Sequence, residues 1–201
     1  ALKGPKTRVV DLKGRTVTPG FHDAHLHFMK GGLAAAQADL NLATSAAVVQ
    51  DRLRAFIAAN PESQWVLGRG WDHTAFPGRA YPTRQDLDIV TSTLPVVLTH
   101  VDGHLLWVNS EALRRAGIGP QTPDPENGRI LRDAQGEPTG ILLESAADAM
   151  EAVVPEPDRE TKKAALRRAL SLARESGVTS IQGPLDIAPQ EQLELAATLL
   201  E

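Results

Sequence analysis

Two histidines, His25 and His27, stand two residues apart shortly after the turn-forming pair Pro19-Gly20. The segment between the turn and Phe28 has the character of a short strand, in which alternate side chains point to opposite faces. Both imidazoles are therefore expected on one face of one strand, with Asp23 one step back on the same face. Two imidazoles placed in this way can chelate one metal ion. The same pair also arises by chance in a chain with six histidines, so the pattern alone leaves both interpretations open.

The composition restricts the classes of function. With no cysteine, the 201-residue chain has no disulfide framework, and a metal must be held by His, Asp, Glu or a modified Lys. The formal net charge is −4, from 21 basic and 25 acidic residues that are interspersed, so no nucleic-acid partner is expected. No apolar run approaches the roughly 20 residues that span a bilayer, and the first residues lack a signal-peptide pattern. We therefore expect a cytoplasmic protein with no membrane partner.

The spacing of apolar and turn residues predicts alternating strands and helices. Strands are expected at 7–11, 14–18, 21–28, 64–70 and 94–101, at 129–131 and 139–143 as a hairpin, and at 178–182 as a buried strand. Helices are expected from a Thr44 cap to Asn60, over Ser110–Ala116 after an Asn109 cap, over 144–153, from an Asp158 cap to Ser176, and from Pro189.

The segment Val17–His27 resembles the first-strand signature of the amidohydrolase superfamily. Five further blocks resemble amidohydrolase family 3, in the branch of N-substituted formamide deformylases, and they occur in the family's order. These blocks are Gly70–Asp72, Pro82–Asp88, Val101–His104 with Val108–Leu113, Gly136–Leu142 and Gly177–Ile181. Because chance rarely reproduces both the motifs and their order, the chain is identified as a member of this family.

The resemblance implies an α/β fold, namely part of a metal-dependent hydrolase (β/α)8 (TIM) barrel. Residues 1–18 would be a remnant of a small β-sandwich domain. Residues 19–201 would be the N-terminal part of the barrel, with a long α+β insertion at about 61–145. His25 and His27 would bind a divalent metal, with zinc as the expected ion and one or two ions in the parent protein. The implied reaction is hydrolysis of a carbon–nitrogen bond in a small amide or formamide substrate.

The sequence departs from the family pattern after His104, because no histidine follows it. The family needs a later Lys or Glu, two more histidines and a proton-handling Asp. His73 and His100 fall in the insertion and cannot be carried over as ligands. We therefore assign no catalytic residue and expect an N-terminal fragment that binds metal weakly and is inactive alone. The alternatives are a non-catalytic α/β module built on the insertion, and a homo-oligomer that assembles through unpaired strands.

Five residues near the implied substrate pocket are secondary candidates: Trp71, Asp72, Asp102, His104 and Glu144. Each also has a structural interpretation. Trp71, with Asp72 beside it, either walls a pocket or belongs to the core, and the core is favoured. Asp102 either orients His104 in a pocket or joins it in satisfying local backbone groups. Glu144 either faces the site or, as we favour, is the first-turn acid of the following helix.

Overall fold

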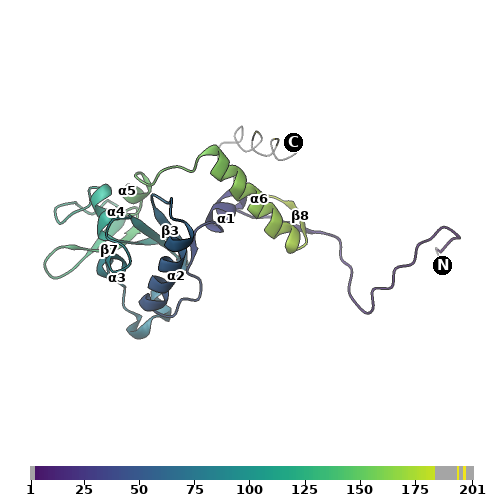
Figure 1. The fold of residues 1–201 in the computed structure, drawn as a ribbon, viewed down its shortest axis with the longest axis horizontal. Helices are drawn as coiled ribbons and strands as arrows, with labels where there is room; N and C mark the ends of the chain where they lie inside the picture. Colours follow the sequence, from purple (N-terminus) through teal and green to yellow (C-terminus); the bar gives the residue numbers. More distant parts are fainter. Residues whose placement is uncertain (1–2, 184–193, 195–196, 198–201) are drawn as a thin grey trace.

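The computed structural model describes residues 3–183, 194 and 197, and the strands of this part of the chain form two sheets. A two-stranded sheet joins β1 (Phe21–Asp23) to β8 (Val178–Ile181). A six-stranded sheet has the order β2-β3-β4-β5-β7-β6. The larger sheet and its helices form one body, with α6 and β8 beside it, and the N-terminal stretch runs away from both (Figure 1).

The larger sheet is mixed. Its parallel half consists of β2 (Ala38–Asp39), β3 (Val66–Trp71) and β4 (Val96–His100). Its antiparallel half consists of β5 (Leu105–Val108), β7 (Pro138–Glu144) and β6 (Gly128–Arg132). The strands predicted at 64–70 and 94–101 and the predicted hairpin are confirmed. Strand β5 was not predicted, because four consecutive buried residues show no alternation.

Both faces of the larger sheet are covered, because alternate strand residues enter different cores. On one face, Leu98 packs with residues of α2 (Ala46–Ala59) and α3 (Arg84–Asp88). On the other, its neighbour Val97 packs with residues of α4 (Ser110–Arg115) and α5 (Asp148–Glu151). The result is a three-layer α/β unit.

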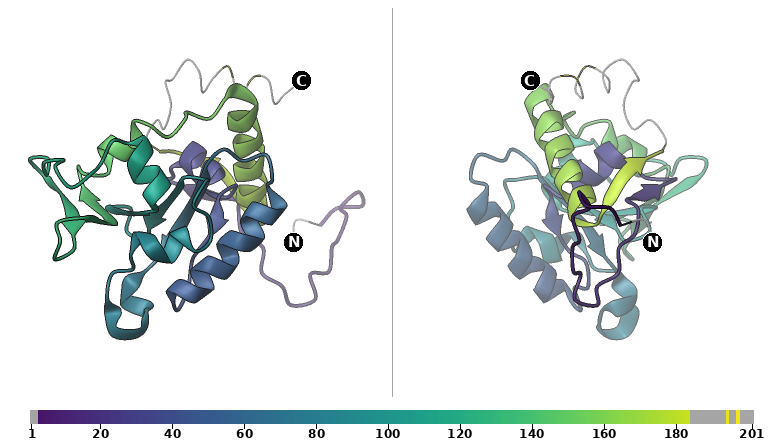
Figure 2. Two further views of the ribbon diagram at one scale, coloured as in Figure 1. Left: turned by 60° about the vertical axis from the view of Figure 1, so that its left-hand side comes forward. Right: turned by 90° about the vertical axis from the view of Figure 1, so that its right-hand side faces the viewer.

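Two helices adjoin the smaller sheet, whose own residues are mostly exposed. Helix α1 (Phe28–Ala34) follows β1, and helix α6 (Arg159–Glu175) precedes β8. The two helices lie side by side around a small apolar core that includes Phe28 and Leu166 (Figure 2). A Cβ at Gly32 would lie 2.2 Å from the carbonyl oxygen of Ala165, so glycine permits this close approach. Strands β1 and β8 are parallel, as in a βαβ unit, but the described residues form no closed barrel.

The strands predicted at 7–11 and 14–18 are absent, and that prediction is wrong. The predicted turn is present, with the backbone N–H of Arg15 donating to the carbonyl of Leu12 at 3.0 Å. Val9, Val10 and Val17 are 63–70% exposed. A strand needs a paired neighbour for its backbone groups, and no described residue pairs with this segment.

Several boundaries also differ from the predictions. Helix α2 is capped by the Ser45 hydroxyl, which accepts from Val48 N at 3.3 Å, rather than by Thr44. Helix α5 covers only part of the predicted range 144–153. Strand β8 is largely exposed rather than buried. The Asn109 and Asp158 caps are confirmed, and the helix predicted from Pro189 lies outside the described residues. Among the described helices, none is long and apolar enough to cross a membrane.

Asn109 connects three parts of the larger unit. Its side chain is fully buried, and its Oδ1 accepts from Val96 N and from Ala112 N, both at 2.9 Å. Its Nδ2 donates to the carbonyls of Leu94 at 2.9 Å and Thr91 at 3.1 Å. One amide therefore caps α4, starts β4 and closes the loop between α3 and β4.

We predict that Asn109→Ala lowers the free energy of unfolding by about 3 kcal/mol, because it leaves buried backbone groups without partners. Urea denaturation followed by circular dichroism measures the change. Asn60→Ala is the matched control, since the Asn60 amide donates to the Phe56 carbonyl at an exposed helix end and should cost only about 0.5 kcal/mol. Equal losses in both variants would contradict the structural role of Asn109.

Candidate metal centre

The two histidines of the first motif lie just beyond the end of β1. The strand ends at Asp23, whose Oδ1 accepts from the backbone N–H of His25 at 3.0 Å and so diverts that group from the sheet. His27 is the residue that precedes α1. The prediction that both histidines belong to one strand is therefore wrong. The two histidines are nevertheless close together, as the prediction implied. Their ring centroids are 5.5 Å apart, with an interplanar angle of 77°.

The backbone around these histidines is tied to β8. Gln182 N donates to the Asp23 carbonyl at 2.7 Å, and Leu26 N donates to the Gln182 carbonyl at 3.1 Å. Both histidines are exposed, and His27 borders a cavity of about 290 Å³. The cavity is also lined by Asp23, Leu26, Phe28, Gly31, Ala169, Leu172, Ala173, Ser176 and Val178. The histidines thus stand just beyond the carboxyl end of β1, and one of them, His27, borders the cavity.

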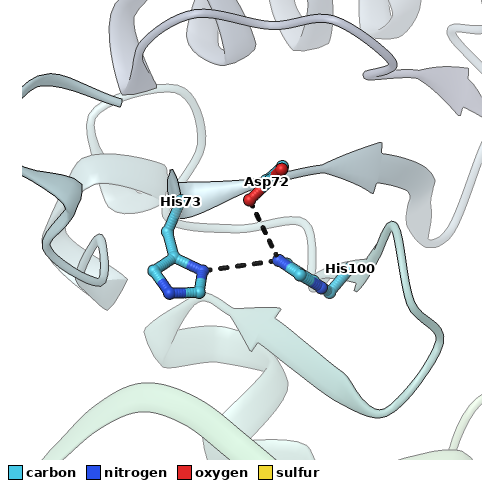
Figure 3. Close-up of side chains that lie close together, drawn as sticks. All are labelled: Asp72, His73 and His100. Carbon is cyan, nitrogen blue, oxygen red and sulfur yellow. Dashed lines mark hydrogen bonds and ion pairs between the residues drawn. The ribbon is translucent and has the colours of Figure 1, made fainter. Parts of the chain in front are cut away.

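A second group of ligand-type side chains lies in the larger sheet. Asp72 directly follows β3 and caps the short 3-10 helix η1 (His73–Ala75), and His100 is the last residue of β4. Because β3 and β4 are parallel, their carboxyl ends bring Asp72, His73 and His100 together, as Figure 3 shows. His73 Nδ1 lies 3.4 Å from His100 Nε2, and Asp72 Oδ1 lies 3.6 Å from the same nitrogen.

This Asp72–His73–His100 cluster is the one group of three ligand-type residues within residues 3–183 whose ligand atoms all lie within 4.8 Å of one another. Among the described residues, His25 and His27 do not belong to a group of three of this kind. Two imidazoles can contribute to a metal site, but catalytic zinc sites normally have three protein ligands. The two groups therefore differ in completeness.

Local bonds set the charge of the cluster. The Thr74 hydroxyl donates to Asp72 Oδ1 at 2.7 Å and Thr74 N donates to it at 2.8 Å, and these bonds lower the pKa of Asp72 below its usual value. Burial, followed by the neighbouring His100, lowers the pKa of His73. Asp72 is thus a carboxylate and His73 a neutral imidazole near neutral pH.

Asp102 supports His100 from the other side. Its Oδ1 lies 2.9 Å from His100 Nδ1, and it also accepts from the backbone N–H of His104 at 2.8 Å. Burial raises the pKa of Asp102, but the bonds from His104 and His100 outweigh it, so the pKa is lowered overall. The Asp102 backbone N also lies 3.4 Å from His100 Nδ1, but the carboxylate contact is shorter. Because an ionised carboxylate can only accept, His100 Nδ1 carries the proton and Nε2 faces Asp72 and His73.

Of the remaining candidate pocket residues, one lies in the hydrophobic core and two lie on the surface. Trp71 is fully buried, contacts Trp107 with ring centroids 5.4 Å apart, and donates from Nε1 to the Leu98 carbonyl at 2.9 Å, so it belongs to the core. His104 Nδ1 lies 3.2 Å from Glu144 Oε2 in an exposed pair. Glu144 is the last residue of β7, so the favoured interpretation as a first-turn helix acid is wrong. The helix was expected to begin there, but the chain turns with Glu144 at φ +50°.

Sequence reasoning missed His73 and His100 as a pair. His73 follows the apolar strand β3, and His100 is the last residue of the apolar strand β4. Their positions at strand ends were the sequence signal that could have identified them as a pair. Their proximity depends on parallel pairing of β3 with β4, which the sequence pattern of two short strands does not specify.

Comparison with known proteins identifies relatives. A family model described as "Amidohydrolase family" matches residues 8–200. The putative amidohydrolase YtcJ of Bacillus subtilis is 36% identical over 175 residues, which is 87% of this chain and 33% of that protein. The N-substituted formamide deformylase of Arthrobacter pascens is 37% identical over 146 residues, or 72% of this chain and 27% of that protein. The chain thus spans about a third of the length of the curated relatives that it matches.

Solved structures agree with the fold. An uncharacterised metal-dependent hydrolase from Pyrococcus horikoshii OT3 matches with a TM-score of 0.64 and 23% identity, over 90% of this chain and 33% of that one. A similarly described protein from Pyrococcus furiosus matches with a TM-score of 0.61 and 23% identity, over 90% and 34%. At this identity the likeness supports the arrangement of helices and strands.

We predict that Trp71→Ala lowers the free energy of unfolding by about 3–5 kcal/mol, because it removes a fully buried indole from the core. His104→Ala should change it by no more than about 0.5 kcal/mol, since the His104–Glu144 pair is exposed to solvent. Chemical denaturation of the two variants measures the contrast. A large loss in His104→Ala would show that the pair contributes to folding in a way that its exposure does not predict.

Proposed function

Because the chain belongs to the amidohydrolase family, we propose that it supplies the first pair of metal-binding histidines, His25 and His27, of a metal-dependent hydrolase. The proposed substrate is the carbon–nitrogen bond of a small amide or formamide. The relative named N-substituted formamide deformylase supports this substrate class, although the chain spans only 27% of that protein. The whole protein's reaction is therefore part of the proposal.

The observation that carries the proposal is the position of the histidine pair. Both rings follow the carboxyl end of a strand that pairs in parallel with β8, and they stand 5.5 Å apart. In α/β barrels the residues beyond the carboxyl ends of the strands form the active site. Two imidazole rings at this separation suit a partial ligand set for an ion such as Zn²⁺.

The backbone fixes this geometry. The Asp23 carboxylate holds the His25 N–H, and Gln182 binds the backbone on both sides of His25. A divalent ion held by His25 and His27 would lower the pKa of water and polarise the substrate carbonyl. The role of His25 and His27 is to bind and orient the ion, while the neighbouring cavity offers space for a small substrate.

We further propose that these 201 residues alone do not catalyse hydrolysis of the substrate. His25 and His27 supply two ligands, whereas catalytic zinc sites normally use three, and no residue here is assigned the role of the proton-handling Asp. Members of a catalytic unit act together, so the loss of one removes most of the rate.

A second candidate function is that of a non-catalytic α/β module. The six-stranded sheet favours it, because helices cover both of its faces and each face has its own cluster of buried apolar residues. In this second function the smaller sheet would provide a contact surface between copies, since Phe21 is 57% exposed and Ile181 is 40% exposed. Unpaired strand edges of this kind promote association.

Turnover measurements distinguish the two functions. A full-length protein that contains these residues should hydrolyse an N-substituted formamide in the presence of Zn²⁺. His27→Ala should reduce kcat/KM by at least about a thousandfold, whereas His22→Ala, on an exposed residue of the same strand, should leave it nearly unchanged. The isolated 201-residue chain should show no turnover above background.

Two results would contradict this account. Comparable rates for the isolated chain and the full-length protein, lost together on His27→Ala, would show that a complete site exists within the 201 residues. A full-length protein whose hydrolysis is insensitive to His27→Ala would exclude the histidine pair from the metal site.

A further inference from the structure

The carboxyl edge of the larger sheet also brings together metal-ligating side chains that the proposed hydrolase site does not use. In the β3–β4 register Trp71 is opposite His100, so Asp72 and His73 begin where β4 ends. His100 is 5% exposed, whereas Asp72 and His73 are half-buried. The ligand atoms therefore converge at an edge that solvent and ions can reach.

The distances match those between ligands of one ion. Bonds of 2.0–2.1 Å in a tetrahedral site place two ligand atoms about 3.3–3.4 Å apart. His73 Nδ1 and His100 Nε2 are 3.4 Å apart, and Asp72 Oδ1 and His100 Nε2 are 3.6 Å apart. All three atoms lie within 4.8 Å of one another, so only small movements would bring them around a single ion.

The surrounding bonds orient the ligands. Asp102 binds His100 Nδ1 at 2.9 Å, which places the Nε2 lone pair toward the cluster. Such a carboxylate–histidine pair is the usual support behind a metal-bound imidazole. Thr74 holds the Asp72 carboxylate through two hydrogen bonds. The Tyr81 ring stacks on His73 with centroids 4.1 Å apart, and the Trp71 ring contacts His100 with centroids 4.8 Å apart.

The three ligand atoms converge around His100 Nε2. When His100 Nδ1 donates to Asp102, Nε2 keeps a lone pair, which lies 3.4 Å from His73 Nδ1 and 3.6 Å from Asp72 Oδ1. A hydrogen bond from His73 to His100 would use two of these three atoms, whereas a metal ion would use all three.

We propose that Asp72, His73 and His100 form a transition-metal site that is independent of His25 and His27. Two imidazole nitrogens and one carboxylate favour ions such as Zn²⁺, Co²⁺ or Ni²⁺ over Mg²⁺ or Ca²⁺, which prefer oxygen ligands. Three protein ligands leave one position for water or another small ligand, as in open zinc sites.

The test uses the 201-residue chain, stripped of metal, with His25→Ala and His27→Ala introduced together. Calorimetric titration with Zn²⁺, paired with the visible absorption of bound Co²⁺, should show one equivalent bound. Adding His73→Ala should weaken the affinity at least tenfold, and Asp102→Asn should weaken it by about 10–100-fold. The matched control, His104→Ala, removes an exposed histidine next to the cluster and should leave the affinity unchanged.

Circular dichroism establishes that each variant is folded. His73 is half-buried, so its replacement disturbs the core less than replacement of the buried His100 would. Absence of saturable binding in the His25→Ala/His27→Ala chain would overturn the proposal, because the three side chains would then be held by their hydrogen bonds alone. Binding that persists unchanged in folded His73→Ala would also overturn it. These results are independent of the proposed hydrolase function, which depends on His27.

Discussion

The parallel pairing of β3 with β4 is the constraint on which the larger unit and its ligand cluster depend. A register shift between Arg69 and Trp71 alters the pairing at the end of β3. Gly70 permits this bulge, since it adopts φ +99° and a Cβ there would lie 2.5 Å from Asn41 Oδ1. Trp71 consequently enters the core, and Asp72 and His73 leave the sheet beside His100.

The same structural rule operates in both sheets. His25 and His27 follow the carboxyl end of β1, which is parallel to β8, and the Asp72–His73–His100 cluster follows the carboxyl ends of β3 and β4. At such ends the side chains are released from the sheet while their backbone is still anchored by it. The two groups differ in their support, because the cluster has three ligand atoms and a buried histidine held by Asp102.

Local sequence signals predicted much of the fold. The Asn109 and Asp158 caps, the apolar strands β3 and β4 and the 128–144 hairpin all carry their own signatures of turn residues and apolar spacing. Family resemblance was equally informative, because the match covers residues 8–200.

The failure to predict the structure of the N-terminal segment has a physical cause. The apolar residues around Val9 and Val17 resemble strands, yet a strand forms only with a partner.

The site was predicted only in part. The proximity of His25 to His27 followed from their spacing, but the end of β1 depends on a side-chain bond from Asp23 that competes with the sheet. His73 and His100 are 27 residues apart, and only the tertiary pairing of two strands makes them neighbours. Glu144 was assigned to a helix because its sequence suits a first turn, whereas pairing with β6 extends β7 through it.

We propose that this chain carries two separate sets of metal ligands, and that the set in the larger sheet binds an ion without the other. Anomalous diffraction from a crystal of the 201-residue chain soaked in limiting Zn²⁺ tests it most directly. The account predicts a strong peak about 2.0–2.1 Å from both His73 Nδ1 and His100 Nε2, with the Asp72 carboxylate as the third protein ligand. A peak at His25 and His27 with none at the cluster, or no ordered zinc at either place, would contradict it.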